Sequence, residues 1–432
     1  MKPITPLNHK IIGSTYRDDT RKSGNSVSRI VSCNSCNLLS KSLLAVIIII
    51  FLFHAAFVFA GDLPPTQVEK TQKIDLLLES AISRGLIAGG VVLIGDRKGV
   101  LFEQAYGRTS PGPNTPLMEI DTIFDIASLT KVVATAPAIL KLAEEGKLSL
   151  VDPVVRWFPE FAGKGKDDLL VLNLLTHTSG FDDFPLTPHN PLQSAVERAA
   201  AQKLNGEIGS RFRYADINFI LLGEMVRRIT GTGLDRYTAA SFFTPMGMQD
   251  TSFNPDKEKV QRCSATIGTD NALLVGHVQD PVACQLGGIA GHAGVFSTAR
   301  DLARFCRMIL DEGEFEGIRI LSERAVRQMT APYFSRGGNV IRGLGWDIAS
   351  PYSAPKGNGF SEGSFGHTGY SGSSLWLDPT ADIFVILLTS RLNYKNYKEF
   401  SQLRCELSTL SLELFPNAAA RRELAGYNRP DR

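Results

Sequence analysis

Apolar and polar residues alternate along the chain in patterns that predict helices near both ends and two hairpins. Residues 66–84 repeat apolar side chains at helical spacing until Gly85, which predicts a helix over that range. Residues 89–107, GGVVLIGDRKGVLFEQAYG, alternate apolar residues around a polar, Gly-containing turn, which predicts a β-hairpin. The same reasoning predicts a second hairpin over 374–390, turning at Asp378-Pro379-Thr380, and an amphipathic helix over about 395–414.

The order of these elements predicts the fold class. A helix and a hairpin lie near each end of the chain, and the long region between them has mainly helical patterns. This order favours an α+β protein, an α/β sandwich whose antiparallel sheet is formed from N- and C-terminal segments and flanked by helices. We expect an inserted, mainly helical lobe over about 130–340, and a functional site in the cleft between sheet and lobe.

The first sixty residues differ in composition from the rest of the chain. Residues 1–42 carry seven Lys or Arg and two Asp, and residues 43–60, LLAVIIIIFLFHAAFVFA, are apolar apart from His54. As a helix this apolar run would reach roughly 27 Å at about 1.5 Å per residue, which is marginal for a bilayer core of about 30 Å. Small residues before Gly61 suit cleavage by a signal peptidase. The sequence therefore predicts a basic leader over 1–61 whose export signal is cleaved, with an uncleaved anchor as the alternative.

Either fate of the leader places the rest of the chain outside the membrane, because the positive flank stays in the cytoplasm. We expect a periplasmic or other extracytoplasmic protein, with membrane contact only through residues 43–60 if they are kept. One domain is expected over 62–415, followed by a tail over 416–432. Cys33 and Cys36 have no second pair to complete a zinc site. The exported cysteines could form one disulfide, which the sequence does not assign: Cys263, Cys284, Cys306 and Cys405.

Composition and charge exclude several classes of function. The chain is 43% hydrophobic and 21% charged, which is ordinary for a globular protein. A formal net charge of +2 gives no general attraction to nucleic acid. The sequence also lacks a Walker-type phosphate loop, a CxxC…CxxC framework and a strand-embedded GxGxxG. These absences make an enzyme that works with its own side chains a stronger candidate.

Ser128 and Lys131 are candidates for such chemistry, because they lie three residues apart at the start of a predicted helix. Apolar positions repeat at helical spacing from Val132 to Ala143, and Gly146 suits the helix end. Residues i and i+3 share one helical face, so the lysine amine can reach the serine hydroxyl. A lysine can take the serine proton if burial or a nearby cation lowers its pKa. Chance alone could also supply this spacing.

Two further segments supply partners for this pair. RFRYADINFILLGEMV, at 211–226, places Tyr214 and Asp216 before an apolar helix, and FGHTGYSGSSLWLDP, at 365–379, contains His367-Thr368-Gly369. Together the three motifs resemble the serine β-lactamase and penicillin-binding-protein family, in particular class C β-lactamases, DD-peptidases and related esterases, which carry SxxK, YxN and KTG or a variant in this order. The segments LLTHTSG and GGIAGHAGVFSTARDLARF also match, and the resemblance runs from about 65 to 400.

The resemblance implies a β-lactamase/transpeptidase-like fold and an acyl-enzyme mechanism that requires no metal or organic cofactor. It implies that Ser128 is the acylated nucleophile, Lys131 its base and Tyr214 the proton relay to the leaving group. The backbone amides of Ser128 and Tyr370 would form the oxyanion hole. The substrate would contact four further residues: Asp216, His367, Thr368 and Gly369.

Two residues depart from the family's commonest pattern. Asp216 replaces the Asn of YxN, so an ionised side chain there can only accept hydrogen bonds, and contact with a substrate amide carbonyl would be lost. His367 replaces the Lys of KTG, which would hold a substrate carboxylate, and a histidine supplies that charge only partly at neutral pH. The change weakens the expectation of efficient β-lactam hydrolysis.

Other residues are expected to serve mainly the fold. His177 fits a buried, hydrogen-bonded histidine better than a cleft residue, and Trp376 fits the core. His292 suits a substrate wall and a loop-packing role equally well. The sequence is equally consistent with a structural role for Asp280, holding its loop in place, and with a catalytic role. Thr298 and Asp301 are expected to form a helix capping box.

The expected function is that of an exported serine hydrolase, DD-carboxypeptidase-like on D-alanyl peptides. An esterase and a weak β-lactamase are the alternatives among enzymes. A slowly acylating penicillin-binding sensor, or a catalytically inactive binding module, is the alternative from another class. The expected partner is a small-molecule or peptide acyl donor, namely a D-alanyl peptide, a β-lactam or an ester, and not a nucleic acid.

Overall fold

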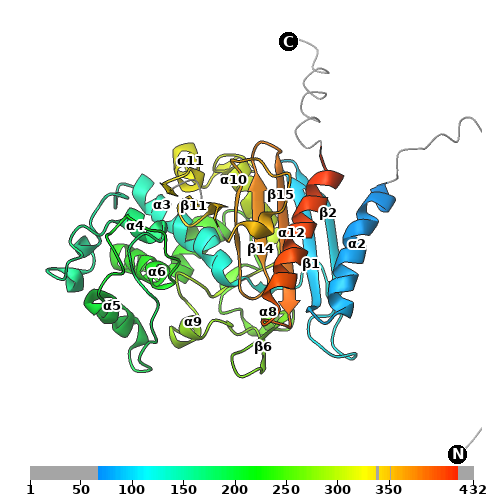
Figure 1. The fold of residues 1–432 in the computed structure, drawn as a ribbon, viewed down its shortest axis with the longest axis horizontal. Helices are drawn as coiled ribbons and strands as arrows, with labels where there is room; N and C mark the ends of the chain where they lie inside the picture. The colour runs from blue at the N-terminus through cyan, green and yellow to red at the C-terminus, as the bar shows by residue number, and fades with distance from the viewer. Residues whose placement is uncertain (1–66, 337–339, 351, 417–432) are drawn as a thin grey trace, which may run out of the picture. The chain divides into compact units, whose positions relative to one another are not determined.

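The computed structural model describes residues 67–336, 340–350 and 352–416. Its central feature is an antiparallel sheet of eight strands (Figure 1). The first hairpin, β1 (Ile87–Asp96) with β2 (Gly99–Gly107), and the second, β14 (Ser374–Asp378) with β15 (Ile383–Arg391), lie next to each other because β1 pairs with β15. The fold class expected from the sequence is confirmed. In spatial order the strands are β10 (Phe334–Arg336), β11 (Val340–Arg342), β12 (Asp347–Ala349), β13 (Phe365–Thr368), β14 (Ser374–Asp378), β15 (Ile383–Arg391), β1 (Ile87–Asp96) and β2 (Gly99–Gly107).

The middle strands are buried on both faces, which is why their sequences read as continuous apolar runs. Val92 and Ile94 of β1 point toward the two terminal helices, α2 (Gln67–Ser83) and α12 (Tyr397–Leu414), while Val91 and Leu93 point into the larger core on the other face. Figure 1 shows α2 and α12 lying together against the sheet. Both helices were predicted from the sequence.

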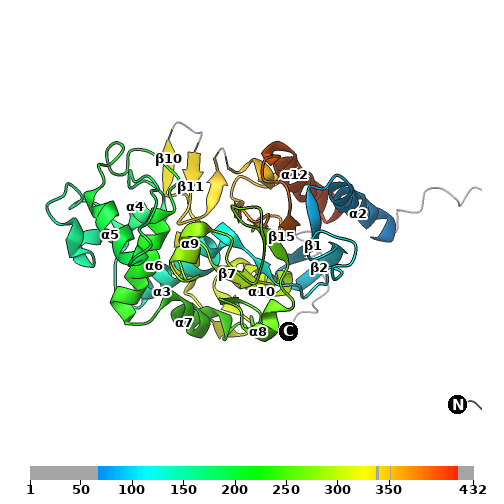
Figure 2. The ribbon, with the colours of Figure 1, turned by 90° about the horizontal axis from the view of Figure 1, so that it is seen from below.

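Most of the helices lie on the other face of the sheet (Figure 2). α10 (Ala299–Leu310) packs directly on β1 and β15. The other described α-helices in this region are α3 (Ala136–Glu144), α4 (Val171–Leu175), α5 (Pro191–Ala201), α6 (Ile217–Thr230), α7 (Leu234–Thr238), α8 (Lys257–Val260), α9 (Pro281–Gln285) and α11 (Glu323–Thr330).

Three small sheets interrupt these helices. The first joins β3 (Phe124–Asp125), β7 (Val295–Ser297) and β4 (Ser252–Phe253), so it brings the segment before Ser128 next to the segment after His292. The others are the hairpins β5 (Ala265–Ile267) with β6 (Leu273–Val275), and β8 (Glu314–Phe315) with β9 (Ile318–Arg319).

Half of the predicted capping box at the start of α10 is present. The Thr298 hydroxyl accepts the Asp301 N–H at 3.2 Å. The Asp301 carboxylate accepts instead from the Asp250 N–H at 2.9 Å and from the Thr251 hydroxyl at 2.8 Å. Asp301 therefore ties α10 to the loop before β4, a long-range contact that local spacing does not reveal.

The four cysteines in the described residues are all free, and Cys263 and Cys306 are buried. The predicted leader over 1–61, with Cys33, Cys36 and the apolar run 43–60, lies outside the described residues, as do residues 417–432 of the tail. Within the described ranges, no helix combines the length and apolar character needed to cross a bilayer.

Candidate active site

Ser128 lies at the start of a helical run that begins with a tight turn, Ala127–Leu129, continues through a π-helical turn, Lys131–Thr135, and becomes α3. Ala127 adopts a φ of +47°, a left-handed conformation that is unfavourable for alanine. Asp125 supports this turn, because its Oδ1 accepts the Ala127 N–H at 2.8 Å and its Oδ2 accepts the Gln279 N–H at 2.7 Å. Gly146, with a φ of +72°, follows the end of α3 as the sequence predicts.

The Asp125 carboxyl group is almost fully buried beneath this turn. Burial raises its pKa to about 6, although the two N–H donors act in the opposite direction. The turn that carries Ser128 is therefore held by a carboxyl group whose charge changes at mildly acidic pH.

Three acceptors surround the buried Lys131 amine. Its Nζ lies 3.2 Å from the Ser128 Oγ and 3.0 Å from the His292 carbonyl oxygen. Its shortest contact is 2.7 Å, to the Asp216 Oδ1. An ammonium group has three N–H donors, so this arrangement suits the protonated lysine.

The electrostatics of Lys131 differ from the sequence-based expectation. Burial alone would lower its pKa, but the Asp216 carboxylate, together with Tyr214, outweighs burial and raises the pKa above its ordinary value. A carboxylate within 2.7 Å stabilises the ammonium form. Lys131 is therefore charged at neutral pH and cannot take a proton until it has lost one.

Tyr214 lies between Lys131 and a buried histidine. The centre of its ring is 5.1 Å from the Lys131 Nζ and 4.4 Å from the centre of the His177 ring, on which it stacks. Burial raises the pKa of Tyr214, and the nearby Lys131 charge only partly opposes this effect, so the phenol is neutral. Hydrogen bonds with Lys131 and Ser128 also lower the pKa of the phenol, which places its hydroxyl beside both side chains.

His177 is a buried, hydrogen-bonded histidine, as the sequence suggests. It has a φ of +55°, and its Nδ1 accepts the Ala215 N–H at 3.2 Å. Burial, and then the charges of Arg342 and Lys131, hold its pKa well below the ordinary value. A neutral His177 thus fixes the position of Tyr214 from behind.

His367 is also neutral. Only 6% of the residue is exposed on β13, and its Nδ1–H donates to the Thr368 carbonyl oxygen at 2.8 Å. Burial, followed by the charges of Arg342 and Lys131, holds its pKa well below the ordinary value. The sequence suggested a partly charged histidine, and the difference arises because burial in a cationic environment disfavours protonation.

The turn that follows His367-Thr368-Gly369 packs directly against the residues before Ser128. The Ser371 hydroxyl donates to the Asp125 carbonyl at 2.6 Å, and the Ser373 hydroxyl donates to the Ile126 carbonyl at 2.8 Å. Gly369 allows this approach, since a Cβ there would lie 2.5 Å from the Ile126 carbonyl oxygen. The backbone of Tyr370 is thereby held close to that of Ser128.

Two buried arginines fasten the same turn from the other side. The Arg404 Nη2, from α12, donates to the carbonyls of Gly369 and Ser373 at 2.7 Å each. The Arg391 Nη1, at the end of β15, donates to the Tyr370 carbonyl at 3.1 Å. Both arginines also lie over the ring of Phe400.

A cavity of about 280 Å³ opens above Ser128. Three guanidinium groups line it, from Arg342, Arg391 and Arg404, and each has an Nε without a hydrogen-bond partner among the described residues. Asp347 is the one carboxylate in the lining, and its Oδ1 lies 3.3 Å from the Arg342 Nη1. The complete lining is Ser128, Tyr214, Arg342, Asp347, Tyr352, His367, Thr368, Gly369, Tyr370, Arg391, Tyr397 and Arg404.

Asp280 and His292 hold the loop that contacts Lys131. The His292 Nε2 lies 2.9 Å from the Asp280 Oδ1, which also accepts the Ala283 N–H at the start of α9. Burial would raise the pKa of Asp280, but the interaction with His292 outweighs it and lowers the pKa to about 2. Asp280 thus ties down its loop, as one of the two sequence interpretations holds. Ligand atoms of Asp216, Asp280 and His292 come close enough to bind a metal ion, but the Lys131 ammonium already supplies a positive charge beside Asp216.

A sequence model of the beta-lactamase family matches residues 74–400. The chain belongs to this family. Among curated proteins, it is 29% identical over 363 residues to the "Putative D-alanyl-D-alanine carboxypeptidase" of Escherichia coli K12, covering 75% of this chain and 83% of that protein. It is 28% identical over 362 residues to the N-acetylmuramyl-L-alanine amidase of Bacillus subtilis, covering 75% and 81%. A solved penicillin-binding protein homologue from Caulobacter crescentus has the same fold, with a TM-score of 0.66, 21% identity and coverage of 82% and 99%.

The three beta-lactamase family motifs meet around the cavity above Ser128. Tyr214 and the whole His367–Tyr370 segment line it with Ser128, and Lys131 lies beneath. Asp216 does not line this cavity, because its carboxylate is directed at Lys131. Most of the site residues predicted from the sequence thus lie together around this cavity. Asp216 lies outside its wall.

Several site residues of this beta-lactamase family member escaped sequence reasoning. Arg342, Arg391 and Arg404 come from separate elements and share no motif. Asp125 lies only three residues before Ser128, and this closeness to the SxxK motif was its one signal in the sequence, since its burial appears only in the structure.

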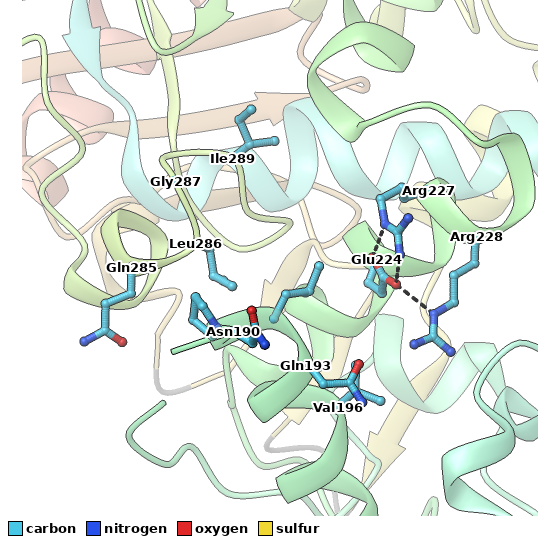
Figure 3. A pocket seen from close by; sticks show the side chains of 12 residues that line it. Asn190, Gln193, Val196, Glu224, Arg227, Arg228, Gln285, Leu286, Gly287 and Ile289 are labelled. Atoms are coloured by element: carbon cyan, nitrogen blue, oxygen red, sulfur yellow. Dashed lines mark hydrogen bonds and ion pairs between the residues drawn. The ribbon is translucent and has the colours of Figure 1, made fainter. Parts of the chain in front are cut away.

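A second cavity, of about 550 Å³, lies away from Ser128, between α5, α6 and the turn after α9 (Figure 3). Its buried Glu224 binds Arg227 and Arg228 at 2.7 Å each, and Arg228 also binds Glu160. The charged groups of its wall are therefore paired with one another. None of its lining residues lines the cavity above Ser128.

Proposed function

We propose that this beta-lactamase family hydrolase is a DD-carboxypeptidase that removes the terminal residue from D-alanyl peptides. The observation that carries the proposal is the group of buried arginines lining the cavity above Ser128. A carboxypeptidase must bind a terminal carboxylate, and guanidinium groups bind carboxylates strongly because they donate two parallel hydrogen bonds. With three guanidinium groups and one carboxylate in its lining, the cavity has an excess of positive charge.

This role compensates for the neutral His367. The commonest family motif places a lysine at that position, and a neutral histidine cannot replace its charge. Arg342 is the candidate for this role because it does not hold the turn around Tyr370. Its Nη2 donates to the Gly345 carbonyl and its Nη1 pairs with Asp347, while its Nε has no hydrogen-bond partner among the described residues. An esterase acting on neutral esters would have no use for this excess of positive charge.

The proposed reaction is acyl transfer to Ser128 followed by hydrolysis. The Ser128 oxygen attacks the carbonyl carbon of the penultimate D-alanine, and the N–H groups of Ser128 and Tyr370 stabilise the oxyanion. Tyr214, as a neutral phenol, donates a proton to the leaving amine, and a water molecule then releases the acyl group. The name of the Escherichia coli relative supports the peptide substrate, and the name of the Bacillus relative also describes cleavage of an amide bond.

A matched pair of substrates tests the proposal. We expect a peptide ending in D-Ala-D-Ala to be hydrolysed with a kcat/KM about 10- to 100-fold above that of the same peptide with a C-terminal amide, since a hydrogen bond to a charged group contributes about 1.5–3 kcal/mol. Release of the terminal residue is measured by chromatography. Turnover only of simple esters would support the esterase instead, and equal rates for the two peptides would show that the cavity does not select a terminal carboxylate.

We also propose that residues 43–60 direct export of the protein and that the leader is then removed. The apolar run and the small residues before Gly61 support this proposal. The intact mass of the protein recovered from an exporting host distinguishes a chain that begins at Gly61 from one that keeps its anchor.

A further inference from the structure

We propose that Asp216 is the final acceptor of the Ser128 proton during acylation, a role that rests on the proposed function. The sequence suggested that Asp216 binds substrate. Its Oδ1 instead lies 2.7 Å from the Lys131 Nζ, and the residue is absent from the cavity wall.

The geometry around Lys131 shows why a further acceptor is needed. The Lys131 Nζ donates to the Ser128 Oγ and to the His292 carbonyl oxygen, and it forms an ion pair with the Asp216 Oδ1 at 2.7 Å, so its surroundings suit an ammonium group. An ammonium group has no lone pair and cannot take a proton from Ser128. Lys131 can relay the proton only if it gives one of its own to another group.

Of the groups in contact with the Lys131 Nζ, only Asp216 can accept that proton. The His292 contact is a backbone carbonyl oxygen, which is a very weak base. Ser128 is itself the donor, and Tyr214 is a neutral phenol beside both. The Asp216 carboxylate forms an ion pair with Nζ at 2.7 Å, and its Oδ1 has no hydrogen-bond partner among the described residues, so this oxygen is free to take the proton.

Charged and titratable groups from several elements surround the ion pair of Lys131 and Asp216. Lys131 and Tyr214 face Asp216 directly, and Asp183 caps the start of α6 by accepting the Ile217 N–H at 2.9 Å. Asp280 and His292 approach from the loop around α9, with ligand atoms within 4.8 Å of Asp216. The described residues that face Asp216 thus include two other carboxylates, Asp183 and Asp280, while Lys131 is the fixed cation.

The proton balance of the step is complete. As the Ser128 oxygen bonds to the substrate carbonyl carbon, its proton passes to the Lys131 Nζ while one Lys131 proton passes to the Asp216 Oδ1. The lysine stays an ammonium ion, and Asp216 becomes a neutral carboxylic acid. When the C–N bond breaks, Tyr214 gives its proton to the leaving nitrogen and takes one from Lys131, which recovers the proton held by Asp216. Deacylation repeats the cycle with water in place of Ser128.

The substitution Asp216→Asn tests this relay, because it restores the commonest family residue and keeps the shape of the side chain. We expect acylation by fluorescent penicillin at pH 7 to be about 100-fold slower or more, as is usual when proton transfer in the transition state is lost. We also expect the rate of the variant to rise with pH as Lys131 loses its proton, because without the Asp216 carboxylate burial lowers the pKa of this lysine. The wild type should show no such rise with pH near neutrality.

Two further variants serve as controls. Asp216→Glu keeps a carboxylate and should retain the wild-type shape of the pH profile at a reduced rate. Asp183→Asn removes a neighbouring negative charge without touching Lys131, and should leave the profile close to that of the wild type. A reduced rate in Asp216→Asn with an unchanged profile would show that Asp216 only positions Lys131, and would overturn the relay.

The proposed function fails in a different way from the relay. If wild-type protein forms no adduct at Ser128 with either fluorescent penicillin or p-nitrophenyl acetate, the acyl-enzyme mechanism itself is wrong. If the wild type is acylated and Asp216→Asn is acylated as fast at pH 7, only the relay is wrong.

Discussion

At the scale of single residues, charge placement decides how the site differs from the common family pattern. Asp216 keeps Lys131 protonated, and burial keeps His367 neutral. His367 therefore adds no positive charge to the cavity. Positive charge in the cavity comes instead from arginines on other elements, and Arg342 pairs there with Asp347 at 3.3 Å. Substrate selectivity should therefore depend on Arg342 more than on the histidine.

The paired substitution Arg342→Gln with Asp347→Asn tests this dependence. It removes both charges together, because removing the arginine alone would leave a buried carboxylate without its partner. We expect the preference for the free carboxylate over the amide peptide to fall by about 10-fold or more, with the amide rate little changed. The single variant Asp347→Asn serves as the matched control and should keep the preference. An unchanged preference in the double variant would assign carboxylate binding elsewhere.

At the scale of elements, the turn that carries Ser128 depends on contacts from three directions. Asp125 binds the N–H groups of Ala127 and Gln279 from below, and the hydroxyls of Ser371 and Ser373 bind the backbone from the β13–β14 turn. These contacts offset the unfavourable left-handed conformation of Ala127. The turn is therefore assembled from distant segments of the chain, and Asp125 is the member whose charge depends on pH.

The substitution Asp125→Asn should change both the stability and its pH dependence. The folded-state pKa of about 6 lies above the ordinary value of about 4. The native state therefore binds more protons between these values, and Asp125 makes the free energy of unfolding fall as pH rises from about 4 to 6. An asparagine offers one acceptor oxygen to two buried N–H groups, which costs about 1–3 kcal/mol.

Urea unfolding at several pH values measures this effect. The difference between wild type and Asp125→Asn should be largest near pH 4 and should shrink by pH 7, because the wild type must then bury a charge. The variant Asp96→Asn, at the distant β1–β2 turn, controls for a general effect of removing an acid. A difference that stays constant with pH would contradict the role assigned to Asp125.

At the scale of the whole molecule, the sequence predicts the sheet-forming ends of the chain better than the middle. The hairpins around Val92 and Ile386 have strong apolar patterns, and the terminal helices have clear limits. The site motifs could be found because family spacing connects Ser128, Tyr214 and His367. The partners of those residues could not, because Arg404, Asp125 and the His292 carbonyl come together only when α12, β3 and the α9 loop pack.

Acylation of Ser128 is tested most directly by intact mass spectrometry of the protein recovered from an exporting host, after incubation with a penicillin. We expect a chain beginning at Gly61 that gains the mass of one penicillin, with the adduct mapped to the peptide that contains Ser128. The adduct should persist long enough to be detected, as in a peptidase, and should be absent from Ser128→Ala. An adduct on another residue would contradict the assignment of Ser128 as the nucleophile. So would a Ser128→Ala variant that still turns over every acyl donor tested.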